Sequence, residues 1–435
     1  MTNVLFTNVR IIDGSGEYPY SGEVLIQGNR IKQVSRSTHT SPRNGLTVID
    51  GAGATLMPGL CDAHTHFSWN DQASLEDIQR MPPEEHTLFA AQVAKIYLDS
   101  GFTSCVGAAA AKARLDVVIR NAINSGQTPG PRYLANSQEI ATLGGLGDTS
   151  PPHIDHPELN FGVVVSGPEE MRRAVRMFVK YGVDLIKLNL SGEEIAGVGA
   201  EETPMDDEEA GMAVREAHRR GLRVCAHARS AESVKMCVRL GIEIIYHASY
   251  ADEEALDMLE ANKDKHFVAL GHAWIIRTSK HAAPWGIAPD SAHALQYQRE
   301  LEVAVEGLKK MHRRGIRVLP GGDYGFAWTP HGTNAKDLEY FVDLLGFSPT
   351  EAIVSATSRG GELMRRPAEL GLVKEGYLAD MILVDGEPLA DIRILQDHDR
   401  LLGHRKGRTV PQDARYGPAA CPSGRLTRDS EAPRK

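Results

Sequence analysis

Two histidines placed two residues apart are the first sign of chemistry in this chain. His64 and His66 belong to the segment CDAHTH at positions 61–66. Side chains two positions apart on a β-strand point to the same side, so both imidazoles would converge at one end of the strand. Paired imidazoles bind zinc and related divalent ions. A short histidine pair also occurs in loops without function, so the motif needs support from elsewhere in the chain.

That support comes from further candidate ligands near the ends of other apolar segments. They are Lys187 in 184–189, His227 in 222–227, His247 in 242–247 and Asp323 in 316–323. Taken singly, each has a structural alternative, a satisfied core histidine or a lysine whose stem packs along the core. Random placement would scatter them among helices and strand starts. The joint pattern therefore predicts one catalytic metal site.

The elements that would position these residues form a regular series. From about residue 58, eight apolar runs are each followed by a helical pattern; they span 59–66, 103–107, 132–136, 184–189, 222–227, 242–247, 266–272 and 316–323. One such helix is expected over 168–182, with Met171, Val175 and Phe178 on one face and Gly182 at its end. Repeated βα units predict an α/β fold, a TIM (β/α)8 barrel with its active site at the carboxyl ends of the strands.

Both ends of the chain have a different character from the barrel. Residues 4–50 alternate in short strands broken by turns, and 371–392 return to short β segments. These two parts predict a small β-sandwich domain built from both chain ends. The expected boundaries are 1–57 and 366–410 for that domain, 58–365 for the barrel, and 411–435 for a flexible tail rich in Pro, Arg and Ser.

Composition excludes several classes of protein. The 435 residues are 42% hydrophobic and 24% charged, which is typical of a globular chain, and the net charge is −9. Without a long basic run, we expect no nucleic-acid partner. We find neither a signal-peptide pattern nor an apolar stretch of about 18 residues, so we expect no membrane association and a cytoplasmic location. The five scattered cysteines favour reduced thiols over disulfides.

Over about residues 1–410 the chain resembles the amidohydrolase superfamily of metal-dependent hydrolases. The segments NVRIIDGSG, VIDGAGATLMPGLCDAHTH and GLVKEGYLADMILVDGEPL carry this resemblance together with the candidate ligands. It implies a binuclear centre in which His64 and His66 hold one divalent ion with Asp323, while His227 and His247 hold the second. Zinc is the expected ion. Lys187 would be carboxylated and bridge both ions, and Asp323 would act as general base and then general acid.

Two segments point to particular branches of that superfamily, near the imidazolonepropionase-like proteins. The loop 141–156 resembles the active-site loop of the dipeptidase and ochratoxin-hydrolysing branch, although Leu146 stands where that branch has a histidine. His153 or His156 could replace it. The block 321–341 is more similar to the branch that hydrolyses phenylureas and thiocarbamates. In that branch an asparagine replaces the bridging lysine, whereas Lys187 is retained here.

Several other residues are candidate substrate contacts. The tryptophans fall in segments that follow strands one, seven and eight, and would form either an aromatic substrate pocket or a satellite core. Arg229 and Tyr250 could reach a substrate carboxylate or carbonyl, or lie at the rim. His272 and His331 fall on the same face of the barrel. The candidates are Trp69, Arg229, Tyr250, His272, Trp274, Trp328 and His331.

The combined pattern predicts hydrolysis of a carbon–nitrogen bond in a small aromatic or apolar molecule, such as an amide, carbamate, urea or peptide-like bond. One alternative is a mononuclear deaminase, or a lyase or decarboxylase on the same fold. Deaminases of this superfamily usually carry an HxxE motif near strand five, and here the segment ends in Ser230. Another alternative is an inactive scaffold, against which the complete ligand set argues. The resemblance also implies a homo-oligomer.

Overall fold

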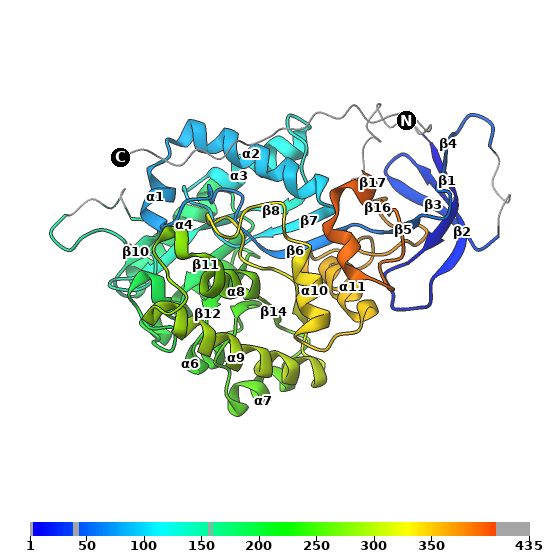
Figure 1. Cartoon of the computed structure of the whole chain (residues 1–435). Coiled ribbons are helices and arrows are strands. Elements are labelled where there is room, and N and C mark those ends of the chain that lie inside the picture. The colour runs from blue at the N-terminus through cyan, green and yellow to red at the C-terminus, as the bar shows by residue number, and fades with distance from the viewer. Residues whose placement is uncertain (1–2, 38–42, 155–156, 158–159, 406–435) are drawn as a thin grey trace, which may run out of the picture.

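The computed structural model describes residues 3–37, 43–154, 157 and 160–405. His156, Cys421 and the predicted tail 411–435 lie outside this part of the chain. Figure 1 shows a helix-covered barrel with a smaller β domain at one side. The helix predicted over 168–182 is confirmed as α4 (Pro168–Tyr181), which buries the expected face and ends at Gly182 in a left-handed conformation.

The barrel strands are parallel and follow the chain in order. They are β6 (Leu60–Thr65), β7 (Phe102–Gly107), β8 (Arg132–Leu134), β9 (Asn136–Thr142), β11 (Leu185–Asn189), β12 (Arg223–Ala228), β13 (Ile244–His247), β14 (Phe267–Ala269) and β15 (Val318–Leu319). A short strand β10 (Val163–Val165) pairs with β9. The third barrel strand is divided into β8 and β9 at Ala135. The amide of Ala63 donates to the carbonyl of Pro320 at 3.0 Å, which brings the first strand to the last. The predicted TIM barrel is confirmed.

Helices surround the barrel and are joined to its strands by loops (Figure 1). Besides α4 they are α1 (Leu75–Arg80), α2 (Pro83–Asp99), α3 (Leu115–Ser125), α5 (Asp207–His218), α6 (Ala231–Leu240), α7 (Glu253–Ala261), α8 (His272–His281), α9 (Ala292–Arg313), α10 (Lys336–Asp343), α11 (Pro349–Ala356) and α12 (Ser358–Leu363). Apolar side chains of these helices pack on the outer face of the strands and form the largest core cluster.

The small domain is a mixed sheet made from both chain ends, as predicted. Its strands are β1 (Val4–Ile11), β2 (Tyr20–Gln27), β3 (Arg30–Ser35), β4 (Thr47–Asp50), β5 (Thr55–Pro58), β16 (Met381–Val384) and β17 (Leu401–Arg405), in the order β17-β16-β5-β1-β2-β3 with β4 beside β1. The two chain ends meet where β5 pairs antiparallel with β16. The sheet has its own apolar core, which includes Val24, Ile26 and Met381.

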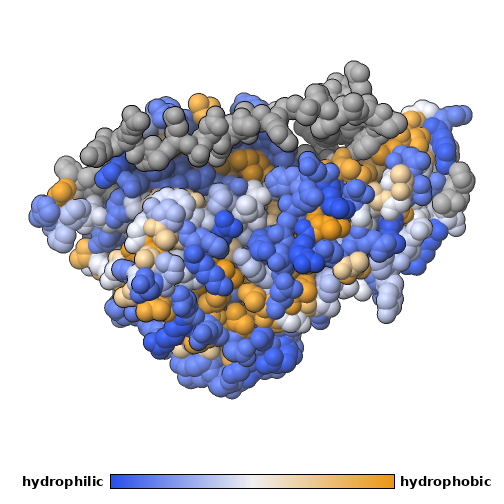
Figure 2. Space-filling view, viewed as in Figure 1, coloured by the Kyte–Doolittle hydropathy of each residue, from blue (hydrophilic) through white to orange (hydrophobic). Residues whose placement is uncertain are grey.

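The surface is mainly hydrophilic on the face shown in Figure 2, with hydrophobic patches between the polar areas. In the part of the chain that the structure describes, no helix combines the length and the apolar character needed to span a bilayer.

A bidentate ion pair joins the small domain to the barrel. Arg132 on β8 contacts Asp380, next to β16, through Nε at 2.5 Å and Nη2 at 3.1 Å. The Asp380 side chain is only 1% exposed, while that of Arg132 is 20% exposed. A carboxylate this deeply buried depends on its cation, because it has lost almost all of its hydration.

Replacing Arg132 by methionine should therefore destabilise the protein by about 3 kcal/mol, since a buried carboxylate would lose its partner. The free energy of unfolding from urea titration measures this loss. Arg393→Met is the matched control, because Arg393 pairs with Asp391 where both side chains are largely exposed, and such pairs contribute below about 1 kcal/mol. Equal losses in the two variants would contradict the role of the buried pair.

Candidate active site

Four histidines line the mouth of the barrel as a continuous group of rings. The ring centroids of His66 and His64 lie 5.1 Å apart, those of His64 and His247 also 5.1 Å, and those of His247 and His227 4.5 Å. His64 Nδ1 donates to the carbonyl of Leu270 at 3.3 Å, and His66 Nδ1 donates to that of Ala109 at 3.2 Å. These bonds fix each ring so that its Nε2 is the atom turned toward Asp323.

Asp323 lies against His64 on β6 and His66 directly after that strand. Its Oδ1 is 3.2 Å from His66 Nε2 and 3.7 Å from His64 Nε2. One ligand atom from each of His64, His247 and Asp323 can be chosen so that all three lie within 4.8 Å of one another. Residues from the first, sixth and eighth strand segments thus converge at one end of the barrel.

Lys187 and His227 complete this group from neighbouring strands. Lys187 is 2% exposed on β11, and its Nζ lies 3.8 Å from Glu139 Oε1. His227 on β12 donates from Nε2 to the carbonyl of Gly192 at 2.9 Å, which leaves Nδ1 as its potential ligand atom. The structure therefore brings all six predicted ligands to the lining of one pocket.

The backbone near the ligands is unusual. His247 and Asp323 have φ values of 72° and 64°, in the left-handed region that non-glycine residues rarely adopt. Two glycines allow the close approach of neighbouring chain: a Cβ at Gly271 would lie 2.3 Å from His247 Nδ1, and one at Gly321 would lie 2.6 Å from His64 Cβ. A strained backbone conformation persists only where the surrounding structure stabilises it, and it occurs mainly at functional sites.

A second buried carboxylate fixes the turn that carries Asp323. Asp337 accepts hydrogen bonds from the amides of Gly321 and Gly322 and, at 2.9 Å, from the hydroxyl of Tyr324. Burial raises the pKa of Asp337 to about 7 despite these bonds. The turn on both sides of Asp323 is thus held from behind, independently of anything bound in front of it.

Burial sets the charge state of the ligands. Desolvation holds the pKa values of His64, His227 and His247 well below their usual range, so these imidazoles are neutral at neutral pH. Burial raises the pKa of Asp323, whereas His64 and His66 lower it when they carry a proton, and the net shift is downward. Neutral imidazoles and an ionised carboxylate are the forms that bind a divalent cation.

Three buried polar atoms of the group test whether a metal fits. His66 Nε2, His247 Nδ1 and Asp323 Oδ1 are buried and make no hydrogen bond. Polar atoms buried without a partner are costly, and a bound cation would satisfy a carboxylate oxygen and imidazole nitrogens together. The donor set therefore fits a divalent metal.

Apolar side chains form the rest of the pocket wall. Trp69 stacks on His66 with ring centroids 3.4 Å apart, and Phe326 packs edge-on between Trp69 and Trp274. Leu75, Leu146, Ile195 and these three aromatics line the pocket with the predicted ligands. The space that a water-sized sphere can reach inside is about 30 Å³, room for only a few waters.

The other candidate substrate contacts lie outside this lining. Trp328 packs behind Phe326, and Tyr250 is partly buried away from the pocket. His272 begins α8 and is buried, and His331 donates to the carbonyl of Trp69 at 2.8 Å, so it supports the loop that carries that tryptophan. His153 is exposed. Of the seven candidates, only Trp69 and Trp274 reach the pocket.

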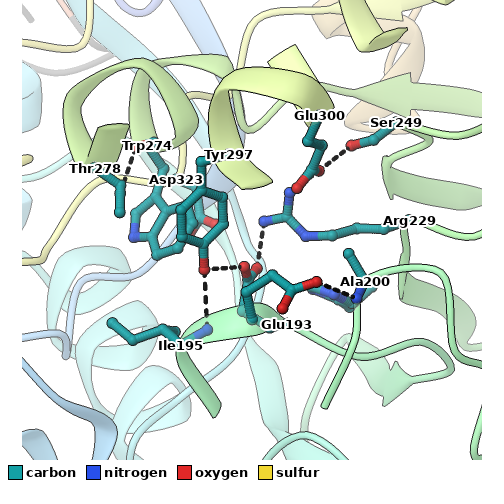
Figure 3. A network of polar contacts seen from close by, with 12 residues as sticks. Glu193, Ile195, Ala200, Arg229, Ser249, Trp274, Thr278, Tyr297, Glu300 and Asp323 are labelled. Atoms are coloured by element: carbon teal, nitrogen blue, oxygen red, sulfur yellow. Dashed lines mark hydrogen bonds and ion pairs between the residues drawn. The ribbon is translucent and has the colours of Figure 1, made fainter. Parts of the chain in front are cut away.

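Arg229 is held between two carboxylates and does not line the pocket (Figure 3). It is fully buried and forms ion pairs with Glu193 and Glu300. Tyr297 donates to Glu193 at 2.6 Å, and Ser249 donates to Glu300 at 2.5 Å. The guanidinium is thus occupied by the protein's own acids, and not free for a substrate carboxylate.

Two charged pocket residues were missed from the sequence, Glu139 and Glu193. Glu139 lies on the continuation of the third barrel strand and accepts from Asn189 Nδ2 at 2.7 Å. Glu193 follows β11 in the loop that precedes α5. The one signal for Glu193 was its place in a loop after a barrel strand, where this fold collects functional groups.

Glu193 should make stability depend on pH. Burial raises its pKa to about 7, although Arg229 lowers it, against an ordinary value of 4.5. Between these two values the folded state binds more protons than the unfolded state, so the contribution of Glu193 to stability falls as pH rises. The melting temperature of wild type minus that of Glu193→Gln should therefore decrease from about pH 5 to about pH 7. A difference that stays constant over this range would contradict the shift, and Glu194→Gln serves as the control.

Comparison with known proteins identifies the family of this chain. Residues 55–410 match the family described as the Amidohydrolase family. Ochratoxinase from Aspergillus niger is 26% identical over 432 residues, covering 94% of this chain and 86% of that protein. A solved Xaa-Pro dipeptidase has a TM-score of 0.83 at 28% identity, covering 93% and 98% of the two chains.

A prolidase complexed with N-methylphosphonate-L-proline has a TM-score of 0.84 at 25% identity, covering 94% of this chain and 99% of that one. The family match extends over the whole barrel and over strands β5, β16 and β17 of the small domain. The chain belongs to the Amidohydrolase family and is a hydrolase that acts on carbon–nitrogen bonds.

Proposed function

We propose that this hydrolase cleaves an amide or peptide-like bond of a small aromatic or apolar molecule at a two-metal centre. The observation that carries the proposal is the single pocket in which His64, His66, Lys187, His227, His247 and Asp323 face an aromatic wall. Ochratoxinase, Xaa-Pro dipeptidase and prolidase, the names of similar proteins, favour an amide over a carbamate or urea.

The ligands would divide between two ions, most simply zinc. His64, His66 and Asp323 would hold one, and His227 and His247 the other, with a carboxylated Lys187 between them. Divalent ions supply a hydroxide nucleophile near neutral pH and polarise the scissile carbonyl. A carbamate on Lys187 would be an anionic ligand, which suits a site for divalent cations.

Asp323 has the position and the charge to move a proton. It is ionised at neutral pH, its Oδ1 lacks a hydrogen-bond donor, and the turn that carries it is held by Asp337. It would accept a proton from the attacking water and then deliver that proton to the leaving nitrogen, the two halves of general base and general acid catalysis. A fixed carboxylate can do both because it need not move between the steps.

The apolar wall would bind the body of the substrate and exclude water. Trp69, Trp274 and Phe326 offer flat apolar surfaces beside the ligands. Exclusion of water strengthens the electrostatic interactions in the pocket. The deaminase alternative lacks the glutamate of the HxxE motif, since Ser230 stands at its fourth position. The Ser230 side chain instead caps α6 by accepting from the amide of Ser233.

Replacing Asp323 by asparagine should lower kcat by roughly 10²–10⁴-fold on aryl amides, because the proton acceptor is lost while the shape survives. Elemental analysis of the same sample should still find much of the metal. Asp343→Asn, at an exposed position on α10, is the matched control. Near-wild-type turnover by the asparagine variant would exclude the assigned role.

Replacing Lys187 by alanine should lower the metal content from near two ions per chain and reduce activity. Short carboxylic acids such as formate should restore part of both, since they can occupy the place of the carbamate. Elemental analysis and amide hydrolysis with and without formate measure this, with Lys309→Ala on the outer helix α9 as control. If neither metal content nor rescue responds, Lys187 has a structural role.

A further inference from the structure

The charged groups of the pocket are unevenly distributed. Apart from the six predicted ligands, the polar side chains that line it in the described chain are two acids, Glu139 and Glu193. Lys187 is the one lysine or arginine among these lining residues, and it faces Glu139 at 3.8 Å. Glu193 lies instead with Ile195 and Tyr297, which contacts Trp274 (Figure 3).

Arg229 does not neutralise this side of the pocket. One guanidinium shared by Glu193 and Glu300 leaves the cluster with one net negative charge when both acids are ionised. Glu300 is turned toward the protein, where the hydroxyl of Ser249 also donates to it. Glu193 is the member of the cluster that lines the pocket, so the excess negative charge is presented there.

Glu193 retains the capacity to accept further hydrogen bonds. Its Oε1 accepts from Tyr297, and its Oε2 contacts Arg229. An ionised carboxylate offers about four lone-pair sites, so these two contacts leave about two for another donor. Arg229 and Tyr297 also fix the side chain in one orientation, so that a donor would meet a preorganised acceptor.

Two features of the surroundings favour a cationic donor in particular. Glu193 is a buried acid whose pKa of about 7 reflects desolvation and the nearby charge of Glu300, and an added positive charge would relieve both. The Trp274 ring packs edge-on against Tyr297 with centroids 5.0 Å apart. Trp274 lines the same pocket as Glu193, and its indole already lies near a cation, the Arg229 guanidinium, whose Cζ is 5.6 Å from the ring centroid.

We propose that Glu193 is a specificity-determining residue that binds a protonated amine of the substrate. This assignment rests on the proposed amide hydrolysis. It predicts that preferred substrates combine an apolar or aromatic body with an ammonium group near the scissile bond. A carboxylate at the same place is disfavoured, because it would face Glu193 while Arg229 is already engaged.

Two series of anilides with one scissile bond each test the proposal. The first comprises 4-(aminomethyl)acetanilide, 4-(hydroxymethyl)acetanilide and 4-acetamidobenzoate, with the charge on the leaving amine. The second comprises benzanilides with the same three kinds of substituent, aminomethyl, hydroxymethyl and carboxylate, on the acyl ring. Metal-loaded wild type is assayed near pH 8, above the pKa of Glu193 and below that of a benzylic amine.

In at least one series, kcat/KM for the aminomethyl compound should exceed that for the hydroxymethyl compound roughly tenfold or more, and the carboxylate should be poorest. In Glu193→Gln the aminomethyl-to-hydroxymethyl ratio should fall to near one. Glu194→Gln, one residue along the same turn, should keep the wild-type ratio, because Glu194 accepts from the amide of Ala200 and does not line the pocket.

Binding of benzylamine and benzyl alcohol by calorimetry gives a readout independent of turnover. Wild type should bind benzylamine more tightly than benzyl alcohol, and Glu193→Gln should lose this difference. If the wild type hydrolyses the neutral anilides without preferring the aminomethyl compounds, or if the glutamine variant keeps the preference, the proposal is overturned. If no anilide is cleaved but benzylamine binding depends on Glu193, the proposed amide hydrolysis fails and the amine site stands.

Discussion

Closure of the barrel between its first and last strands is the constraint on which the site depends. The bond from the amide of Ala63 to the carbonyl of Pro320 holds β6 against the segment that follows β15. Only then does Asp323 come within 3.2 Å of His66, although the two are far apart in the chain. The first barrel strand and the residue after it therefore contribute two histidines to a site that the segment after the last barrel strand completes.

A second feature of the site is the burial of its charged groups. Almost every polar group at the barrel mouth is withdrawn from water, so its charge is decided by its neighbours. Desolvation keeps His64, His227 and His247 neutral, while the pKa of Asp323 is shifted downward, so that Asp323 is ionised. Arg229 is fully buried and is stabilised by two carboxylates at once. The charges around the pocket are thereby set by contacts among buried groups of the protein.

The aromatic side chains near the pocket fulfil both roles that the sequence left open, a satellite core and a pocket wall. Trp69, Trp274 and Phe326 belong to one apolar cluster with Trp328, and therefore form a satellite core. The first three also face the ligands and form the pocket wall. Packing among the loops makes this wall rigid, which suits a site whose shape must select an apolar substrate.

Sequence alone was sufficient for the barrel, for the small domain built from both chain ends, and for the residues that now lie together at the barrel mouth. These features are local, since strand periodicity and the position of a residue near a strand's end can be read from a few neighbours. The left-handed backbone at His247 and Asp323 has no comparable signal, because it depends on how adjacent loops pack.

Only the tertiary structure decided which charges meet. Arg229 looked available to a substrate until Glu300, 71 residues further along on α9, proved to be its partner. His331 and His272 were expected at the catalytic end of the barrel, yet neither lines the pocket, and the ring of His331 donates to the carbonyl of Trp69 instead. Glu139 and Glu193 do line it. Pairing of buried polar groups is a long-range consequence of packing, and the spacing of residues along the chain does not encode it.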